Sequence, residues 1–389
     1  MIKLGCRFKK VGADVFFDRH DDPDNVEYCN QVFLPAMKEY ERNSKVYSEY
    51  LLLNPQFRAH LTADEKVVLI CQDEVIFKTY DDQKHCWCLE GFRALKKKGE
   101  GRGIMLSGFT TQQDGFLKLS QEDVDEINRR RADEGMDAMT HLTECGKSRD
   151  GYWNEDRMAE QLKDMVSVYE YLYPDHKLVF TFDYSQCHDC LPDDALAAGR
   201  MNVGPGGKNQ LLNMRPAQAT RDYGPGKNYP DGLKAGEFQC MYFQEGDEPP
   251  DNMDVETDAG LRDWEAMLAT PTLKGMKYII QEWGLYKVGM TKNGGKERPE
   301  FRNQKSKFHE VLEPRGHVCL FSPKYHCELQ AVERIWGKSK YYVRKYCKYT
   351  WASLKENIPV SLSETAKSPL TRYRFYRKTR DYMRAYREG

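Results

Sequence analysis

Residues 317–348 have the sequence HVCLFSPKYHCELQAVERIWGKSKYYVRKYCK. The first five form a short apolar run with strand character, which ends at the Ser-Pro pair that contains Pro323. Beyond this corner the spacing becomes helical, and Glu333 falls on the same stripe as Leu329 and Trp336. Because an inward-facing carboxylate is costly unless a cation meets it, the stretch predicts a strand, a corner and a helix with one functional glutamate.

The composition is that of a globular protein with a large solvated surface. The chain has 389 residues, enough for one large domain or two ordinary ones, with 40% hydrophobic and 31% charged residues. It shows no signal-peptide pattern, and no apolar run approaches the roughly 18 residues that span a bilayer, which argues against a membrane partner. Twelve cysteines without a secretion signal indicate reduced thiols inside the cell.

The formal net charge of −1 conceals an uneven distribution of charge. From Arg334 to Gly389 there are fifteen Lys and Arg against four Asp and Glu, so the rest of the chain is acidic. A basic tail on an acidic body indicates a polyanionic partner.

Buried-strand patterns and helical patterns follow one another along much of the chain. A helix is expected at 151–174 and another after the last strand, and the expected strands are 66–78, 87–93, 101–109, 177–183 and 317–321. This order predicts an α/β, RNase H-like fold, in which three antiparallel strands are joined by two parallel ones and flanked by helices.

The same patterns divide the chain into three parts. We expect an N-terminal helical or linker segment at 1–62, a core at 63–348 and a basic, aromatic, helical tail at 349–389. The core carries insertions at about 110–150, which is charged and irregular, and at about 195–305, which is rich in Gly, Pro, Asn and Asp. We expect the second to be an insertion rather than a separate core domain.

Three carboxylates lie at positions where catalytic groups are found in α/β proteins. Asp73 and Asp183 each end an apolar strand, and active groups collect at the carboxyl ends of strands in open α/β sheets. If these strands are neighbours, the two aspartates lie side by side and Glu333 completes the group. Such a group needs divalent cations to offset its repulsion, and hard oxygen ligands select Mg²⁺ or Mn²⁺. The alternative is structural, since a strand-end Asp often caps a turn and a helix Glu often pairs with a Lys.

Three ordered segments carry a resemblance to a known family. They are ICQDEVIF with Asp73, FTFDYSQCHDC with Asp183 and His188, and SPKYHCELQAVERIW with Glu333. They resemble the catalytic motifs of mariner-type DDE transposases, although Tyr184 replaces the usual Asn and QAV replaces N-P-I before the glutamate. The segments GRGIMLSGF, GKSRDGYWNED and RMNVGPGGKNQ are similar to a group of eukaryotic DDE superfamily endonucleases, so the likeness spans roughly residues 17–389.

The resemblance implies a DDE transposase or endonuclease that uses two Mg²⁺ or Mn²⁺ ions for phosphodiester cleavage and strand transfer on DNA. Asp73 and Asp183 would be the principal ligands, Glu333 would hold the second ion, and Glu74 and His188 would stand behind the ligands. It further implies a nuclear location, transposon-end and target DNA as partners, a homodimer as one option, and no nucleotide cofactor. The helix-turn-helix reader of such transposases is not visible before the first motif, so we expect a truncated or element-derived chain.

Aromatic and basic residues alternate in the last fifty residues. Cations can follow a nucleic-acid backbone while aromatic rings stack on unpaired bases. A solvated basic helix over a tyrosine-lined core is the alternative. The residues that we expect to contact DNA lie in one glycine-rich turn, at the end of the core and in the tail, and they are Lys208, Lys338, Lys340, Arg344, Lys345, Arg372, Arg374, Arg377 and Lys378.

Two other motifs are set aside. GPGGKNQ at 204–210 lacks the spacing of a phosphate-binding P-loop, and we interpret it as a glycine-rich turn whose Lys208 could contact a phosphate. Cys187 and Cys190 around His188, and the HCWC segment that starts at His85, have different spacings, which argues against a zinc site.

Two other functions remain open at this stage. One is a transposon-derived DNA-binding protein without catalysis, which would keep the basic tail but would not need the three carboxylates. The other is an RNase H-like nuclease that acts on RNA, which differs only in its substrate.

Overall fold

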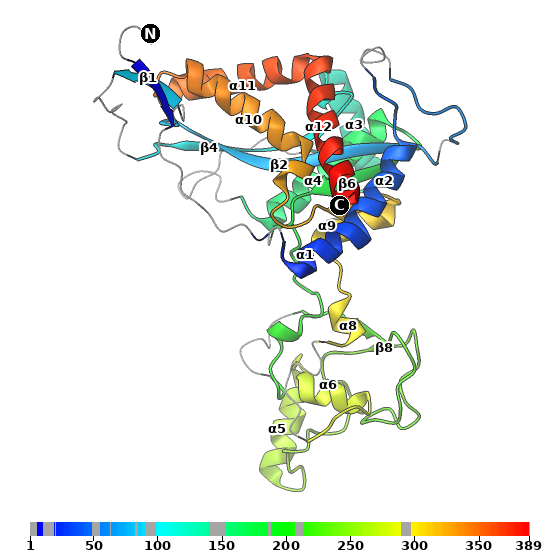
Figure 1. Cartoon of the computed structure of the whole chain (residues 1–389). Coiled ribbons are helices and arrows are strands. Elements are labelled where there is room, and N and C mark those ends of the chain that lie inside the picture. The colour runs from blue at the N-terminus through cyan, green and yellow to red at the C-terminus, as the bar shows by residue number, and fades with distance from the viewer. Residues whose placement is uncertain are drawn as a thin grey trace. The chain divides into compact units, whose positions relative to one another are not determined.

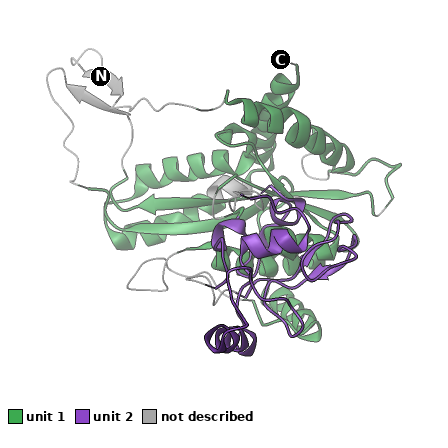
Figure 2. Ribbon diagram, turned by 90° about the horizontal axis from the view of Figure 1, so that it is seen from below, with its two compact units in different colours: residues 1–189, 308–389 green, residues 190–307 purple. Residues whose placement is uncertain are grey.

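The computed structural model describes residues 6–10, 19, 21–48, 55–62, 64–81, 85–89, 99–139, 153–185, 188–206, 213–288 and 297–388. The chain forms two compact units, which Figure 2 shows in different colours. The first consists of Met1–Asp189 and Phe308–Gly389, and the second of Cys190–Lys307.

The first unit is built on a five-stranded mixed sheet with the order β5-β4-β2-β6-β9. The strands are β5 (Gly115–Phe116), β4 (Gly103–Thr111), β2 (Val67–Lys78), β6 (Lys177–Phe182) and β9 (Val318–Phe321). Strands β5, β4 and β2 are antiparallel, whereas β6 and β9 continue the sheet in parallel with β2. This confirms the predicted fold class, an RNase H-like α/β arrangement with three antiparallel and two parallel strands.

One predicted strand lies elsewhere. The strand expected at 87–93 is β3 (His85–Leu89), and it pairs with β1 (Cys6–Lys10) rather than with the central sheet. The third antiparallel strand is instead the short β5. It returns along β4 because the Thr111 hydroxyl accepts a 2.9 Å hydrogen bond from the Asp114 N–H, and Gly115 adopts the left-handed φ of 70° that a tight turn requires.

One face of the sheet is covered by α4 (Glu155–Leu172) and α9 (Lys307–Leu312). The expected helix at 151–174 is confirmed, and it begins where the Asn154 side chain accepts a hydrogen bond from the Arg157 N–H. Its apolar stripe packs with strand residues that face the same side, among them Ile70, Phe180 and Phe182.

The first insertion is more regular than expected. It contains α3 (Gln121–Asp133), which starts with a capping box in which Ser120 and Asp123 each bind the other's backbone N–H. Its surface is charged, and the buried face is narrow, with Ile127 at 1% exposure. The irregular appearance of the sequence was therefore misleading for 121–133.

The opposite face carries α10 (Ala331–Tyr346) and α11 (Trp351–Lys367), next to α12 (Pro369–Glu388), as Figure 1 shows in orange and red. Val332 and Trp336 of α10 pack against Val75 and Phe77 of β2. The helix begins at Ala331, so Leu329, which the sequence placed on the helical stripe, lies instead in a separate 3₁₀ turn, η5 (Cys327–Leu329), together with Glu328.

The N-terminal segment belongs to the same unit. It contains α1 (Pro23–Tyr28), the π-helical turn η2 (Cys29–Phe33) and α2 (Leu34–Asn43). Buried residues of these helices pack with Leu320 of β9 and Met383 of α12. Within the described residues, no helix is long and apolar enough to cross a membrane.

The second unit has a hydrophobic core of its own, so the expectation of an insertion without a separate core does not hold. Its elements are η3 (Ala198–Arg200), β7 (Ala217–Gln218), β8 (Phe238–Gln239), α5 (Asp258–Ala269), α6 (Met276–Glu282) and α8 (Pro299–Arg302). Trp283 is fully buried in this core, and its ring stacks on Tyr223. The ammonium of Lys274, also buried, lies 2.7 Å from the Glu282 carboxylate.

Candidate active site

The register of two parallel strands brings Asp73 and Asp183 to the same level of the sheet. Strands β2 and β6 are neighbours, as expected, and their last parallel pair is Cys71 with Thr181. Each aspartate lies two residues beyond its member of that pair, and therefore on the same face as that residue. The sequence predicts that strand β2 ends at Asp73. In the structure it continues to Lys78, because its antiparallel pairing with β4 extends that far.

The Ser-Pro corner connects the last strand to the helix that carries Glu333. Ser322 is anchored to the end of β6, since its N–H and its hydroxyl both donate to the Phe182 carbonyl, at 2.8 and 3.1 Å. The chain then passes through η5 into α10, whose first turn contains Glu333. The two aspartates and Glu333 line one cavity of about 420 Å³, with Tyr184, Ser322, Pro323, Tyr325, His326, Cys327 and Gln330.

The environment of this cavity disfavours unpaired negative charge. Burial, together with the nearby charges of Glu333, Glu74 and Asp183, raises the pKa of Asp73 to about 8. Burial also raises the pKa of Glu333, an effect that Lys340 opposes and Asp183 adds to. A cation between the carboxylates would offset this repulsion.

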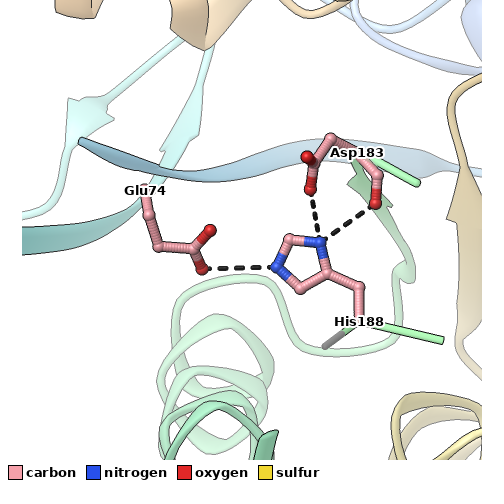
Figure 3. A group of neighbouring side chains, drawn as sticks. All are labelled: Glu74, Asp183 and His188. Atoms are coloured by element: carbon pink, nitrogen blue, oxygen red, sulfur yellow. Dashed lines mark hydrogen bonds and ion pairs between the residues drawn. The ribbon is translucent and has the colours of Figure 1, made fainter. Parts of the chain in front are cut away.

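A second group shares Asp183 (Figure 3). His188 is buried, and its Nδ1 contacts both the carboxylate of Asp183 and, at 3.0 Å, the Asp183 carbonyl. Its Nε2 lies 3.3 Å from Glu74 Oε1. Burial alone would lower the pKa of His188, but the hydrogen bonds to Asp183 and Glu74 outweigh it and raise the pKa to about 10. The imidazole therefore links a carboxylate inside β2 to the carboxylate that follows the end of β6.

A chain of polar side chains extends from Glu74 across the sheet to α4. Gln72 donates through Nε2 to Glu74 Oε1 at 2.6 Å and to the Ser107 hydroxyl at 3.0 Å. The Ser107 hydroxyl in turn donates to Gln161 Oε1 of α4 at 2.6 Å. Sequence reasoning missed these contacts, and Gln72, a buried amide inside an apolar strand, was their one visible signal.

The donor set suits a hard divalent cation. Asp73, Asp183 and Glu333 offer only carboxylate oxygens, the ligands of Mg²⁺ and Mn²⁺. The Glu74, Asp183 and His188 group offers two carboxylates and one imidazole, whose ligand atoms all lie within 4.8 Å of one another. Either group could take part in holding an ion, because both include Asp183.

The residues expected to contact DNA fall into different surroundings. Lys338, Lys345, Arg374, Arg377 and Lys378 are exposed. Lys340 and Arg344 are half-buried, and Arg344 forms a 3.0 Å ion pair with Asp81. Lys208 and the side chains of the HCWC segment lie outside the described residues, as does Cys187.

Arg372 does not fit the expected role. Its side chain is buried, with 8% of the residue exposed, and its guanidinium donates to the backbone carbonyls of Gln112 and Gln113 at 3.1 and 2.5 Å. Arg372 therefore holds α12 against the turn between β4 and β5 and presents no free surface to a ligand.

Comparison with protein-family models gives no match, and none of the curated proteins matches the chain. Among solved structures, the chain is similar to the Mos1 transposase paired-end complex with left transposon end. The alignment has 10% sequence identity and a TM-score of 0.42, and it covers 98% of this chain. It spans 66% of that transposase chain, slightly less than two thirds of its length.

Proposed function

We propose that this protein is a metal-dependent DNA nuclease of the DDE transposase type, which cleaves phosphodiester bonds and joins strands. The observation that carries the proposal is the convergence of Asp73, Asp183 and Glu333 on one cavity, where the pKa values of Asp73 and Glu333 are raised. Carboxylates in such a setting are poorly suited to act as simple turn caps, and they are well suited to bind divalent cations.

In this proposal Asp73, Asp183 and Glu333 hold two Mg²⁺ or Mn²⁺ ions. Ions so held lower the pKa of a bound water or hydroxyl and stabilise the leaving oxygen of an in-line displacement. The protein residues fix the geometry: the sheet holds the aspartates at one level, and the Ser322 anchor holds the start of α10. His188 contacts Asp183 and Glu74 contacts His188, so these two residues would orient the Asp183 carboxylate.

The exposed cations Lys338, Lys345, Arg374, Arg377 and Lys378 would supply the DNA contacts. The sequence resemblance implies DNA rather than RNA as substrate, a nuclear location and, as one option, a homodimer. A DNA-binding protein without catalysis is the main rival, and an RNA nuclease is the second. The three retained carboxylates favour an enzyme over the first rival.

The test is nicking of supercoiled plasmid DNA with Mg²⁺, with Mn²⁺ and with a chelator. We expect nicking with either metal, none with chelator, and none from Asp73→Asn. Asp125→Asn is the matched control, because Asp125 is an exposed carboxylate on α3 that accepts a hydrogen bond from Gln121 in its own helix. Cleavage of a labelled RNA, compared with a labelled DNA of the same length, distinguishes an RNA nuclease from a DNA nuclease. Metal-independent nicking, or full activity of Asp73→Asn, would refute the proposal.

A further inference from the structure

The entrance of the carboxylate cavity carries an exposed aromatic ring. Tyr325 lines the cavity and is 52% exposed, whereas most aromatic residues described in this unit are buried or half-buried. It follows directly after Pro323 and Lys324 at the corner that leads to Glu333. The ring therefore lies beside the position where a bound strand would meet the carboxylates.

The backbone at Tyr325 is held in an unfavourable conformation. Its φ is 66°, in the left-handed region that favours glycine and that is unusual for a bulky residue. The turn is closed on either side, since the His326 N–H donates to the Pro323 carbonyl at 3.3 Å and the Leu329 N–H donates to the His326 carbonyl at 3.1 Å. Strain of this kind is typical of functional sites, where the side chain has a use that glycine could not serve.

Two exposed cations belong to the same part of the molecule as Tyr325, since Lys324 precedes it in the chain and Arg19 interacts with its side chain. The ammonium of Lys324 is 4.3 Å from the centre of the Tyr184 ring, and Lys324 is exposed. Tyr184 itself is fixed, because its hydroxyl donates to Asp189 at 2.8 Å and its ring packs edge-on against Tyr28 and Phe321. The exposed Arg19 guanidinium forms an ion pair with Asp22, and its interactions with Asp22 and, in smaller part, with Tyr325 raise its pKa.

We propose that Tyr325, Lys324 and Arg19 form a binding site for one unpaired nucleotide at the entrance of the cavity. The base stacks on the Tyr325 ring, and the adjoining phosphates meet Lys324 and Arg19. An aromatic ring with flanking cations is the chemistry that recognises single-stranded nucleic acid. Bases inside a duplex are covered on both faces by their neighbours, so the site selects frayed or overhanging ends.

This inference rests on the proposed function, because it assumes that the carboxylates act on nucleic acid. It adds that the substrate carries an unpaired nucleotide next to the reacting phosphate. Binding is measurable with chelator present, so its test does not depend on cleavage.

The experiment compares two fluorescein-labelled DNA duplexes of equal length, one blunt and one with a three-nucleotide overhang that contains 2-aminopurine. Fluorescence anisotropy with EDTA gives the affinities, and quenching of 2-aminopurine reports stacking. We expect the wild-type protein to prefer the overhang at least about fivefold, which is the low end of the effect of one stacked base.

Four variants make the result specific. Tyr325→Ala should lose the preference and the quenching, whereas Tyr325→Phe should keep both because stacking needs only the ring. Tyr325→Gly removes the ring but suits the left-handed φ, so it should lose the preference without loss of thermal stability. Tyr341→Ala is the control, since Tyr341 is 61% exposed on α10 and does not line the cavity.

Equal wild-type affinity for the two duplexes would overturn the inference, as would a preference that survives in Tyr325→Ala or is lost in Tyr325→Phe. A wild-type protein that shows the preference but never nicks DNA would refute the nuclease and leave the nucleotide site standing.

Discussion

Glu328 and Glu333 are five residues apart, and their surroundings assign them different roles. Glu328 accepts hydrogen bonds from the Tyr386 hydroxyl at 2.9 Å and from His326 Nδ1 at 2.8 Å. Burial tends to raise the pKa of Glu328, but these bonds outweigh it and lower the pKa. Glu328 thus ties η5 to the end of α12. Glu333 is an exposed residue that lines the cavity, and the desolvation of its carboxylate, with a smaller effect of Asp183, raises its pKa although Lys340 opposes the shift.

We therefore expect opposite outcomes from two matched substitutions. Glu333→Gln should leave the thermal unfolding curve nearly unchanged and abolish metal-dependent nicking, because it removes a charged ligand but keeps the shape. Glu328→Gln should cost about 1–2 kcal/mol of stability through weakened hydrogen bonds and keep most of the nicking. If Glu328→Gln abolishes nicking and Glu333→Gln keeps full activity, Glu328 is the metal ligand and Glu333 has the structural role.

Glu170 gives a residue-scale prediction about pH. Burial opposes its charge, but hydrogen bonds from His317 at 2.9 Å and from Arg315 at 2.9 and 2.5 Å outweigh burial and lower the pKa to about 2. A depressed carboxyl pKa stabilises the fold above the unfolded-state value of roughly 4.3, and this contribution is lost as the pH falls towards 2.

The variant Glu170→Gln should accordingly be less stable than the wild type by about 1–2 kcal/mol at pH 7, discounted for partial exposure of the carboxylate. The difference should persist at pH 5.5 and shrink by pH 3. Urea unfolding at the three pH values measures it. A difference that stays constant down to pH 3 would mean that packing, not charge, is responsible.

At the scale of elements, α12 has one exposed and one buried face. Arg374, Arg377 and Lys378 are exposed, whereas Arg380 is bonded to Glu41 at 3.0 Å and Arg372 is buried. We expect the triple substitution of Arg374, Arg377 and Lys378 by Ala to weaken non-specific DNA binding. The slope of log affinity against log salt concentration should also become shallower, by an amount that corresponds to about two to three lost phosphate contacts. The matched control replaces Arg129 and Arg130 of α3, which pair with Glu126. An unchanged salt slope would remove α12 from the DNA-binding surface.

Arg372→Ala should behave differently from that triple variant. It leaves the Gln112 and Gln113 carbonyls without their donor in a buried place, which costs about 1–3 kcal/mol. We expect a lower melting temperature and, at temperatures where the variant is folded, unchanged DNA affinity. Reduced DNA affinity in a variant of wild-type stability would restore Arg372 to the binding surface.

The elements that sequence patterns predicted well are those whose burial is decided locally. Strands β2 and β6 are apolar runs, and α4 has a clear stripe with a proline after its end, so these were visible without a structure. The strand β3 was equally visible as a strand, but its partner was not, because pairing depends on which edge is free rather than on the run itself. The start of α10 was misplaced since η5 has the same local spacing as a helical turn.

The same division holds for the candidate site. Asp73, Asp183 and Glu333 were identifiable because each interrupts an apolar pattern. The contacts of Gln72 with Glu74 and Ser107, and the exposed strained ring of Tyr325, depend on tertiary placement that no periodicity records. The resemblance added the roles of the motif residues, but it gave no indication that Arg372 is buried.

At the scale of the whole molecule, the second unit was the least predictable part. Its core is assembled from loops and short elements, so the apolar residues follow neither helical nor strand spacing. Buried polar groups made this core still harder to predict. Glu282 is fully buried, and its carboxylate accepts hydrogen bonds from Lys274, Asn228 and Gln239. A sequence rich in turns and charges therefore resembled a solvated insertion, although it encloses Trp283 and a complete core.

The ends of the second unit lie next to each other, which leads to the last prediction. The Lys307 N–H donates to the Cys190 carbonyl at 2.9 Å, so the chain leaves the unit beside the point where it enters. A short Gly-Ser linker could thus join Asp189 to Phe308, and Phe308 would keep its place in the core of the first unit. The cores of the two units contain different residues, and each has the contacts that a folded domain needs.

We expect the protein with Cys190–Lys307 replaced by such a linker to unfold cooperatively within a few degrees of the full chain. We also expect isolated Cys190–Lys307 to give a near-ultraviolet circular dichroism signal from its buried Trp264 and Trp283. The control deletes Cys190–Glu282, which cuts the second core apart after α6 and leaves its remainder unpaired, and this variant should aggregate or unfold without cooperativity. If the linker variant is also non-cooperative, or the isolated unit lacks the tryptophan signal, the two units are one folding unit and the insertion is part of the core.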